Sequence, residues 1–232
     1  FCQSARRHEG DLTMRHYIWH SFHWGDRPRD REWVDHRLTL WRAHVLPQLI
    51  AMRPRPDKIL VYCRSGDEYA VARWRAQPVP VVLYDRDLLA SDDILAADRE
   101  EDWIAWTRLD CDDLLAASYL RHLADIEPAD GLAAMCTPPG LCYDLLGDRW
   151  GEWHHDSQPN STIFIPGRRW QHREAAWQYA YCRHGEVRSR FRVTRLPSGM
   201  YCNLIHCGNA LNTFRRPLRP TGDRADTLAA EF

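Results

Sequence analysis

The sequence predicts an α/β fold in which a mostly parallel central sheet has helices on both faces. Two observations predict it. Short apolar runs alternate with amphipathic stretches through the first half of the 232-residue chain. Strands that alternate with helices form parallel sheets that are buried on both faces. The composition, with 44% hydrophobic and 27% charged residues, is that of a globular protein with one sizeable core.

The chain begins with a polar, irregular stretch at 1–13, which predicts a lead-in to the fold. The first strand is predicted at 16–22, HYIWHSF, because these residues are rich in β-formers. Asp30 then stands where a helix N-cap is expected. Apolar residues at spacings of three and four follow between 34 and 49, and they predict a helix that ends before the sequence RPRP.

The rest of the first half continues the alternation of strands and helices. Strands are predicted at 58–63 (KILVYC), 79–85 (VPVVLYD) and 103–109 (WIAWTRL), and helices within 65–76, within the acidic stretch 86–101, and from Asp112 or Asp113 onward.

After about residue 128 the pattern changes to Pro, Gly and aromatic residues with short strand-like pieces, which predicts a smaller mixed α+β part. Strands are predicted at 140–146, 161–166, 188–196 and 200–207, a helix within 168–180, and a loop at 150–158 (WGEWHHDSQ). We therefore expect one domain over 14–232, with halves at 14–127 and 128–232.

Charge and hydropathy exclude several classes of function. The formal net charge is −1, so no global field favours nucleic acid. No apolar run is long enough to span a bilayer, which leaves at most a peripheral membrane contact. No N-terminal stretch has the signal-peptide pattern, and none of the eight cysteines forms a CxxC pair. We expect a cytoplasmic protein with reduced thiols; its oligomeric state is left open.

An acidic cluster, Asp110, Asp112 and Asp113, follows directly after the predicted strand WIAWTRL. Capping a helix would need one carboxylate, and three within four residues repel one another. A divalent cation, Mn²⁺ or Mg²⁺, would offset them, since such ions take carboxylates together with substrate phosphates. The alternative is a structural ion pair with Arg108. Ligands of such sheets bind beyond the carboxyl ends of the strands, where this cluster stands.

This position suggests a reaction class. A metal ion at the carboxyl end of a sheet can neutralise a diphosphate leaving group, such as a nucleotide that leaves from a sugar. The sequence has no GxxxxGK motif and no GxGxxG after the first strand, which argues against P-loop enzymes and dinucleotide oxidoreductases.

Three stretches also carry a resemblance to a known family. TRLDCDD resembles the metal-binding motif of glycosyltransferases with the GT-A fold. More narrowly, the chain resembles a bacterial family described as rhamnosyl transferases, over most of 15–215. The stretches are DREWVDHRLTLWRAHVLPQLIAM, TRLDCDDLLAASYL and MYCNLIHCGNALN. The chain departs from that family after the first strand, where YIWHSFHWGD replaces an expected Arg-Phe-Ser.

The resemblance implies a GT-A-like, metal-dependent glycosyltransferase. It would move rhamnose or another deoxyhexose from a nucleotide-diphosphate donor to a glycan or related acceptor. The donor would bind in the half at 14–127 and the acceptor in the half at 128–232.

The resemblance also implies roles for particular residues. Asp110, Asp112 and His206 would hold the metal ion, Asp113 would be a further ligand or a partner of one, and Arg108 would contact the phosphates. We therefore expect the His206 imidazole to face the Asp112 carboxylate. A lone histidine in a structural role is the alternative.

Weaker candidates have structural alternatives. Asp67, Asn209 and Asn212 are expected to contact the donor, or else to cap a helix and make turn hydrogen bonds. If the reaction inverts the sugar's configuration, a catalytic base is expected among Glu152, Asp156 and Asp144. A plain surface loop is the alternative for the segment around Glu152.

Two other functions stay open from the sequence. One is a non-catalytic nucleotide- or sugar-binding module of the same fold, in which Arg108 pairs with the acidic cluster. The other is a zinc protein that uses Cys202, His206 and Cys207, although their spacing matches no usual zinc pattern.

Overall fold

A seven-stranded sheet forms the centre of the molecule. The computed structural model describes residues 13–22, 30–63, 66–79, 82–84, 102–153, 161–171, 186–206 and 232. The strand order is β10-β6-β9-β4-β1-β2-β3. The strands are β1 (Met14–Ser21), β2 (Lys58–Tyr62), β3 (Val82–Tyr84), β4 (Trp103–Arg108), β6 (Leu132–Thr137), β9 (Ser161–Pro166) and β10 (Arg192–Ser198).

The direction of β9 makes this sheet mixed. Strands β3, β2, β1 and β4 pair in parallel, and so do β6 and β10. Strand β9 lies between β4 and β6 and is antiparallel to both. The prediction of a mostly parallel sheet holds for the first-half strands, whereas β9 makes the sheet as a whole mixed.

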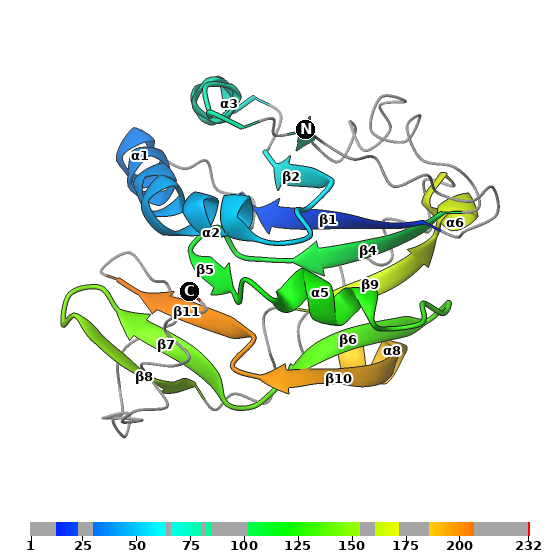
Figure 1. Cartoon of the computed structure of the whole chain (residues 1–232). Helices are drawn as coiled ribbons and strands as arrows, with labels where there is room; N and C mark the ends of the chain where they lie inside the picture. The colour runs from blue at the N-terminus through cyan, green and yellow to red at the C-terminus, as the bar shows by residue number, and fades with distance from the viewer. Residues whose placement is uncertain are drawn as a thin grey trace, which may run out of the picture.

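A second, four-stranded sheet lies beside the first, in the order β5-β11-β7-β8 (Figure 1). Its strands are β5 (Asp113–Leu115), β7 (Gly140–Asp144), β8 (Arg149–Trp153) and β11 (Tyr201–Ile205). Two predictions were wrong here. Asp113 begins a strand instead of a helix, and the sequence RWGEW is strand β8, where a loop was expected. Strand β5 forms by pairing with the distant β11, whereas β8 forms a local hairpin with β7.

Side chains of β1 alternate between two apolar clusters. Ile18 packs on one face of the sheet with Val61, whereas Tyr17 and Trp19 pack on the other. Successive strand residues point to opposite faces, so β1 is buried on both sides. The first face is covered by the helix over residues 31–51 and by α5 (Tyr119–Ala124). On the second face, α8 (Val187–Arg190) contributes Val187.

The first helix runs from residue 31 to 51 as three consecutive segments. These are α1 (Arg31–Leu40), a π-helical segment η1 (Trp41–Val45) and α2 (Leu46–Ala51). Asp30 caps the start, as predicted, and its carboxylate accepts the Trp33 N–H at 2.7 Å. Pro47 donates no N–H, and its ring would clash with a carbonyl of the preceding α-helical turn. The wider π-turns before it accommodate the proline without ending the helix.

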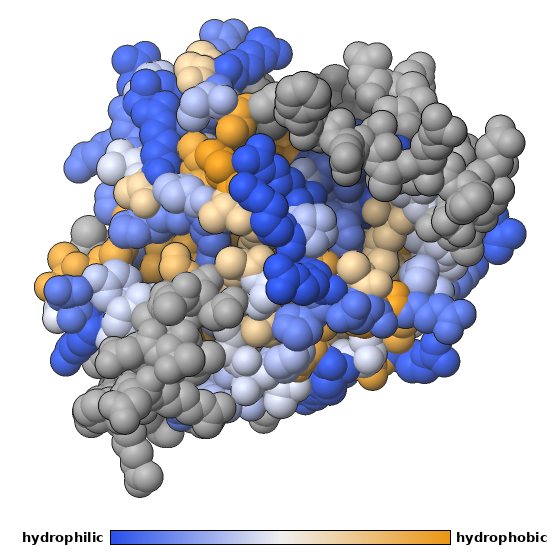
Figure 2. Space-filling model, viewed as in Figure 1, coloured by the Kyte–Doolittle hydropathy of each residue, from blue (hydrophilic) through white to orange (hydrophobic). Residues whose placement is uncertain are grey.

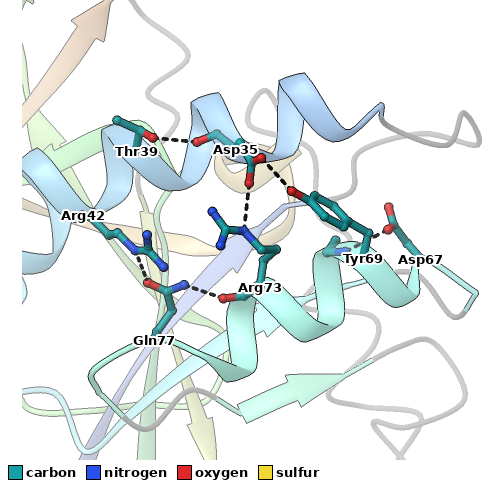
Figure 3. A network of polar contacts seen from close by, with 8 residues as sticks. Asp35, Thr39, Arg42, Asp67, Tyr69, Arg73 and Gln77 are labelled. Carbon is teal, nitrogen blue, oxygen red and sulfur yellow. Dashed lines mark hydrogen bonds and ion pairs between the residues drawn. The ribbon is translucent and has the colours of Figure 1, made fainter.

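A polar network holds α3 (Glu68–Arg75) beside α1 (Figure 3). The Asp35 carboxylate accepts the Tyr69 hydroxyl at 2.6 Å and the Arg73 guanidinium Nε at 2.8 Å. Arg42 donates to the Gln77 side chain, which donates in turn to the Arg73 carbonyl. These contacts fix the position of α1 while its opposite face points into the core.

Other sequence predictions differ in detail from the structure. The predicted strand at 188–196 is helix α8 followed by β10, and the helix within 168–180 is described only as α6 (Gly167–Gln171). The acidic helix at 86–101 lies outside the described residues. In the described part of the chain, no helix has the length and apolar content needed to cross a bilayer.

The surface is predominantly polar. In Figure 2, hydrophilic residues cover much of the face that is coloured, and apolar ones lie between them. Among the described residues, the exposed large hydrophobic side chains are Ile50 and Leu146. Single exposed apolar residues of this kind are ordinary for a folded protein.

Candidate functional site

The candidate site lies at the carboxyl ends of β1 and β4. These strands are parallel neighbours, and their arrowheads point toward α1 and β5 (Figure 1). After β4 the chain makes a turn in which the Asp113 N–H donates to the Asp110 carbonyl at 3.1 Å. Strand β5 then pairs with β11 and places Asp113 opposite Asn203. The acidic cluster is therefore held between the two sheets, at the edge where ligands of α/β proteins bind.

Asp112 is the centre of the site. Its Oδ2 atom contacts Nη1 of Arg37, which comes from α1, and lies 3.0 Å from Nε2 of His206 at the end of β11. All three side chains are nearly buried. Burial opposes ionisation of Asp112, but the contacts with His206 and Arg37 outweigh it and lower the pKa of Asp112. This carboxylate is therefore ionised at neutral pH.

A second histidine extends this arrangement toward the surface. Nδ1 of His206 lies 3.3 Å from Nε2 of the half-buried His36 on α1. The Asp112 carboxylate only accepts, so Nε2 of His206 carries a proton and donates to it. Burial, together with the neighbouring His206 and Arg37, lowers the pKa of His36. His36 is therefore neutral at neutral pH, and its Nε2–H can donate to His206.

Asp113 differs from Asp112 in its surroundings. Its side chain is buried in β5 and accepts a backbone hydrogen bond from Leu204. Burial, followed by the nearby Asp112 and Asp110, raises the pKa of Asp113 well above its usual range. Asp113 is therefore the member of the cluster that holds a proton most readily.

Asp110 and Arg108 form the more open side of the site. Oδ1 of Asp110 lies 3.7 Å from Nε of Arg108, and the Asp110 side chain is 36% exposed. The Arg108 guanidinium lies over the Trp19 ring at 5.5 Å from its centroid. The ion pair that was expected as the structural alternative is thus present. The Asp110 carboxylate still reaches solvent, where a ligand could contact it.

His20 joins the ends of the two strands to the first helix. Its Nδ1 lies 2.8 Å from the Leu109 carbonyl, and its Nε2 accepts the Trp41 indole N–H at 3.2 Å. Each nitrogen thus has one partner in the neutral ring. Complete burial, against the opposing effects of Leu109 and Asp112, lowers the pKa of His20 to about 4. This buried histidine keeps the wall of the site in place.

This lowered pKa predicts acid destabilisation. Unfolded His20 binds a proton near its ordinary pKa of about 6.5, whereas folded His20 stays neutral down to about pH 4. Its contribution to stability is complete above pH 6.5 and decreases as the pH falls toward 4. Protonation of His20 in the unfolded chain should lower the free energy of unfolding by about 2 kcal/mol between pH 7 and pH 5. Urea titrations at several pH values should show a shallower decrease for His20→Gln than for wild type.

His122→Gln, a change of the half-buried histidine on α5, is the matched control. It makes the same chemical change away from β1, so an effect of the His→Gln change by itself would appear in both variants. An unchanged slope in His20→Gln would contradict the assignment of this acid sensitivity to His20.

The arrangement does not fit the metal site expected from the sequence. Oδ2 of Asp112 is in contact with Arg37 and His206, and Asp110 is paired with Arg108. In the described part of the chain, no three His, Cys, Asp or Glu side chains converge as metal ligands would. A divalent ion at Asp112 would have to displace Arg37. Metal binding by Asp110, Asp112 and His206 remains a prediction, and no chemical step is derived through it.

Two residues of the zinc alternative, Cys202 and His206, lie too far apart to bind one ion together. Cys202 is buried in β11, and His206 follows the end of the same strand. Four residues of extended chain span about 13 Å, too far for both side chains to bind one ion. Cys207 lies outside the described residues.

The remaining predicted residues lie apart from the cluster. Asp67 caps α3, with its carboxylate accepting the Ala70 N–H at 3.0 Å. Glu152 is on β8, three strands from β5 and thus about 14 Å away. The Asp144 carboxylate accepts from Gly147 N–H and from Arg149 within its own turn. Asp156, Asn209 and Asn212 lie outside the described residues.

Sequence reasoning assigned no site role to Arg37, His36 or His20. One signal for Arg37 was available, because it stands on the apolar face of the helix, between Val34 and Leu38. A charge on a buried face needs a buried partner. The sequence provides no such signal for His36 or His20, whose partners come from distant segments.

Fold and site together define an α/β protein with a buried Asp–His–Arg arrangement at the sheet edge. No family model and no curated protein matches the sequence. Among solved structures, the inositol-1-phosphate CTP transferase from T. maritima is similar at a TM-score of 0.36 and 9% identity, over 82% of this chain and 89% of that chain.

A protein from Desulfovibrio desulfuricans G20, described as a nucleotide-diphospho-sugar transferase, is similar at a TM-score of 0.36 and 15% identity, over 93% of this chain and 94% of that chain. Likenesses this distant do not assign the chain to a family, so its function has to be inferred from the site.

Proposed function

We propose that the chain is a transferase that acts on a nucleotide-diphosphate sugar. The observation that carries this proposal is the gathering of Arg37, Arg108 and three carboxylates at the carboxyl end of β4. Arg37 comes from α1, Arg108 ends β4, and the carboxylates lie in the turn after β4 and at the start of β5. Arginine suits a diphosphate because its planar guanidinium can donate two parallel hydrogen bonds.

The charges suggest how such a ligand would bind. The diphosphate would lie between two guanidinium groups. Arg108 is stacked on Trp19, and Arg37 comes from the buried side of the site. The half-exposed Asp110 carboxylate can accept hydrogen bonds from ribose or sugar hydroxyls. Positive charge beside the diphosphate stabilises the negative charge that develops as the nucleotide leaves the sugar.

The finer specificity rests on the sequence resemblance alone. Rhamnose or another deoxyhexose as the donor sugar, and a glycan-type acceptor, are proposed on that basis. A catalytic base is assigned to none of the described residues, because Asp144 is held in its own turn and Glu152 lies across the second sheet. Asp156 keeps its proposed role in an inverting reaction.

Calorimetric titration with UDP and dTDP tests the proposal. At least one of them should bind to the full chain with a stoichiometry near one. Arg108→Gln should lower the affinity by about 10- to 100-fold, because hydrogen bonds between charged groups are worth about 1.5–3 kcal/mol. Arg169→Gln should bind as wild type does, since Arg169 pairs with Asp130 elsewhere on the surface. If neither nucleotide binds, the proposal is wrong.

A non-catalytic binding module is the second candidate function. The Arg108–Asp110 ion pair favours it, because this pairing is what that alternative requires. The two functions differ in turnover. A transferase is expected to hydrolyse its nucleotide sugar slowly when no acceptor is present, and liquid chromatography would show the released nucleotide, whereas a binding module would return the ligand intact.

A further inference from the structure

The acidic cluster already has its counter-charges within the protein. Asp110, Asp112 and Asp113 carry at most three negative charges, and Arg37 and Arg108 carry two positive ones. Each guanidinium lies against one carboxylate of the cluster, since Nη1 of Arg37 contacts Oδ2 of Asp112 and Nε of Arg108 lies 3.7 Å from Oδ1 of Asp110. The repulsion that suggested a divalent cation from the sequence is therefore offset by side chains of the protein itself.

Arg37 also occupies the position that an ion would need. A metal ion bound by Asp112 and His206 would have to lie about 2.1 Å from one oxygen and one nitrogen at the same time. The Asp112 oxygen that faces His206 is Oδ2, and Arg37 contacts this same atom. Arg37 comes from the buried face of α1, and its side chain is 10% exposed. Its contact with Asp112 holds the guanidinium at this oxygen.

We infer that Arg37 takes the place of the divalent cation at this site, so that a nucleotide diphosphate binds to the two arginines without Mn²⁺ or Mg²⁺. This inference rests on the proposed function for the nature of the ligand. A guanidinium has five N–H donors in a planar fork, so Arg37 can contact Asp112 and a phosphate oxygen together. His206 then orients Asp112 through its hydrogen bond instead of binding a metal ion.

The test compares nucleotide binding with and without metal in the full chain. UDP and dTDP are titrated calorimetrically in EDTA and again in MnCl₂. The dissociation constants should agree within about twofold, since no ion takes part. Arg37→Met should lower the affinity by about 10- to 100-fold in either buffer, and Arg37→Lys should lower it less because the charge is kept. Circular dichroism of both variants checks that they fold.

A second measurement does not depend on nucleotide. Mn²⁺ is titrated into the ligand-free protein, and the free ion is followed by electron paramagnetic resonance. No stoichiometric binding is expected at this site. Binding of Mn²⁺ that His206→Gln removes would overturn the inference, and so would nucleotide binding that EDTA abolishes and Mn²⁺ restores.

The two proposals fail in different ways. If neither nucleotide binds in either buffer, the proposed function is wrong, and the Mn²⁺ titration still decides the role of Arg37. If nucleotide binds only with Mn²⁺, the proposed function stands and the role of Arg37 is wrong.

Discussion

Asp112→Ala is expected to destabilise the protein by about 3–5 kcal/mol, because breaking a buried ion pair leaves an uncompensated charge. Arg37 and Asp112 have side chains that are 10% and 11% exposed. Without the carboxylate, the guanidinium would stay buried in the core-facing side of α1. Urea unfolding at pH 7, followed by circular dichroism, would measure this loss as a lower midpoint at an unchanged slope.

Two further variants separate this cause from a general effect of the substitution. In Arg37→Met, the change Asp112→Asn should cost far less than it does in the wild type, since neither charge then remains. Asp35→Ala removes an Arg–Asp contact of similar geometry that is exposed to solvent (Figure 3), and it should cost much less. Equal losses for Asp112→Ala and Asp35→Ala would contradict the buried-pair explanation.

Gly140→Ala is expected to destabilise the protein by about 3 kcal/mol through overpacking. A Cβ atom at this position would lie 2.8 Å from Cε2 of Tyr201 and closer still to Cζ and Cε1. The Tyr201 ring is fully buried on β11 and packs in the main core, so it cannot move aside easily. Thermal unfolding by calorimetry would show the lower stability.

Removal of the ring provides the control for this variant. In a Tyr201→Leu background, Gly140→Ala should cost less than about 1 kcal/mol, because the added methyl group no longer meets ring carbons. A cost that is the same in both backgrounds would show that the strain arises elsewhere. Because His206 directly follows the end of β11, nucleotide binding by Gly140→Ala would also report on how firmly this strand positions the site.

Local features of the sequence predicted the first half of the fold well. The Asp30 cap and the apolar spacing of the first helix depend on residues a few positions apart, and both are found in the structure. The short apolar runs at β1, β2 and β4 are strands for the same reason. The prediction that His206 faces Asp112 is also confirmed, because the two side chains are in contact. Their role as metal ligands stays a prediction.

Predictions failed where long-range pairing decides the structure. Asp113 would begin a helix by local preference, but β5 pairs with β11 some ninety residues later. The failure at 150–153 has a different cause, because these residues were expected in a loop but form a local hairpin strand, β8, with β7. The reverse direction of β9 follows from the path of the chain through the sheet, which periodicity alone does not determine.

The sequence by itself determined that three carboxylates stand at a strand end and that their repulsion must be offset. Only the tertiary structure decided what offsets them. Arg37 is 75 residues away from Asp112 along the chain, and His206 is 94 residues away in the other direction. Electrostatic energy depends on distance in space and on burial, and neither can be obtained from sequence spacing.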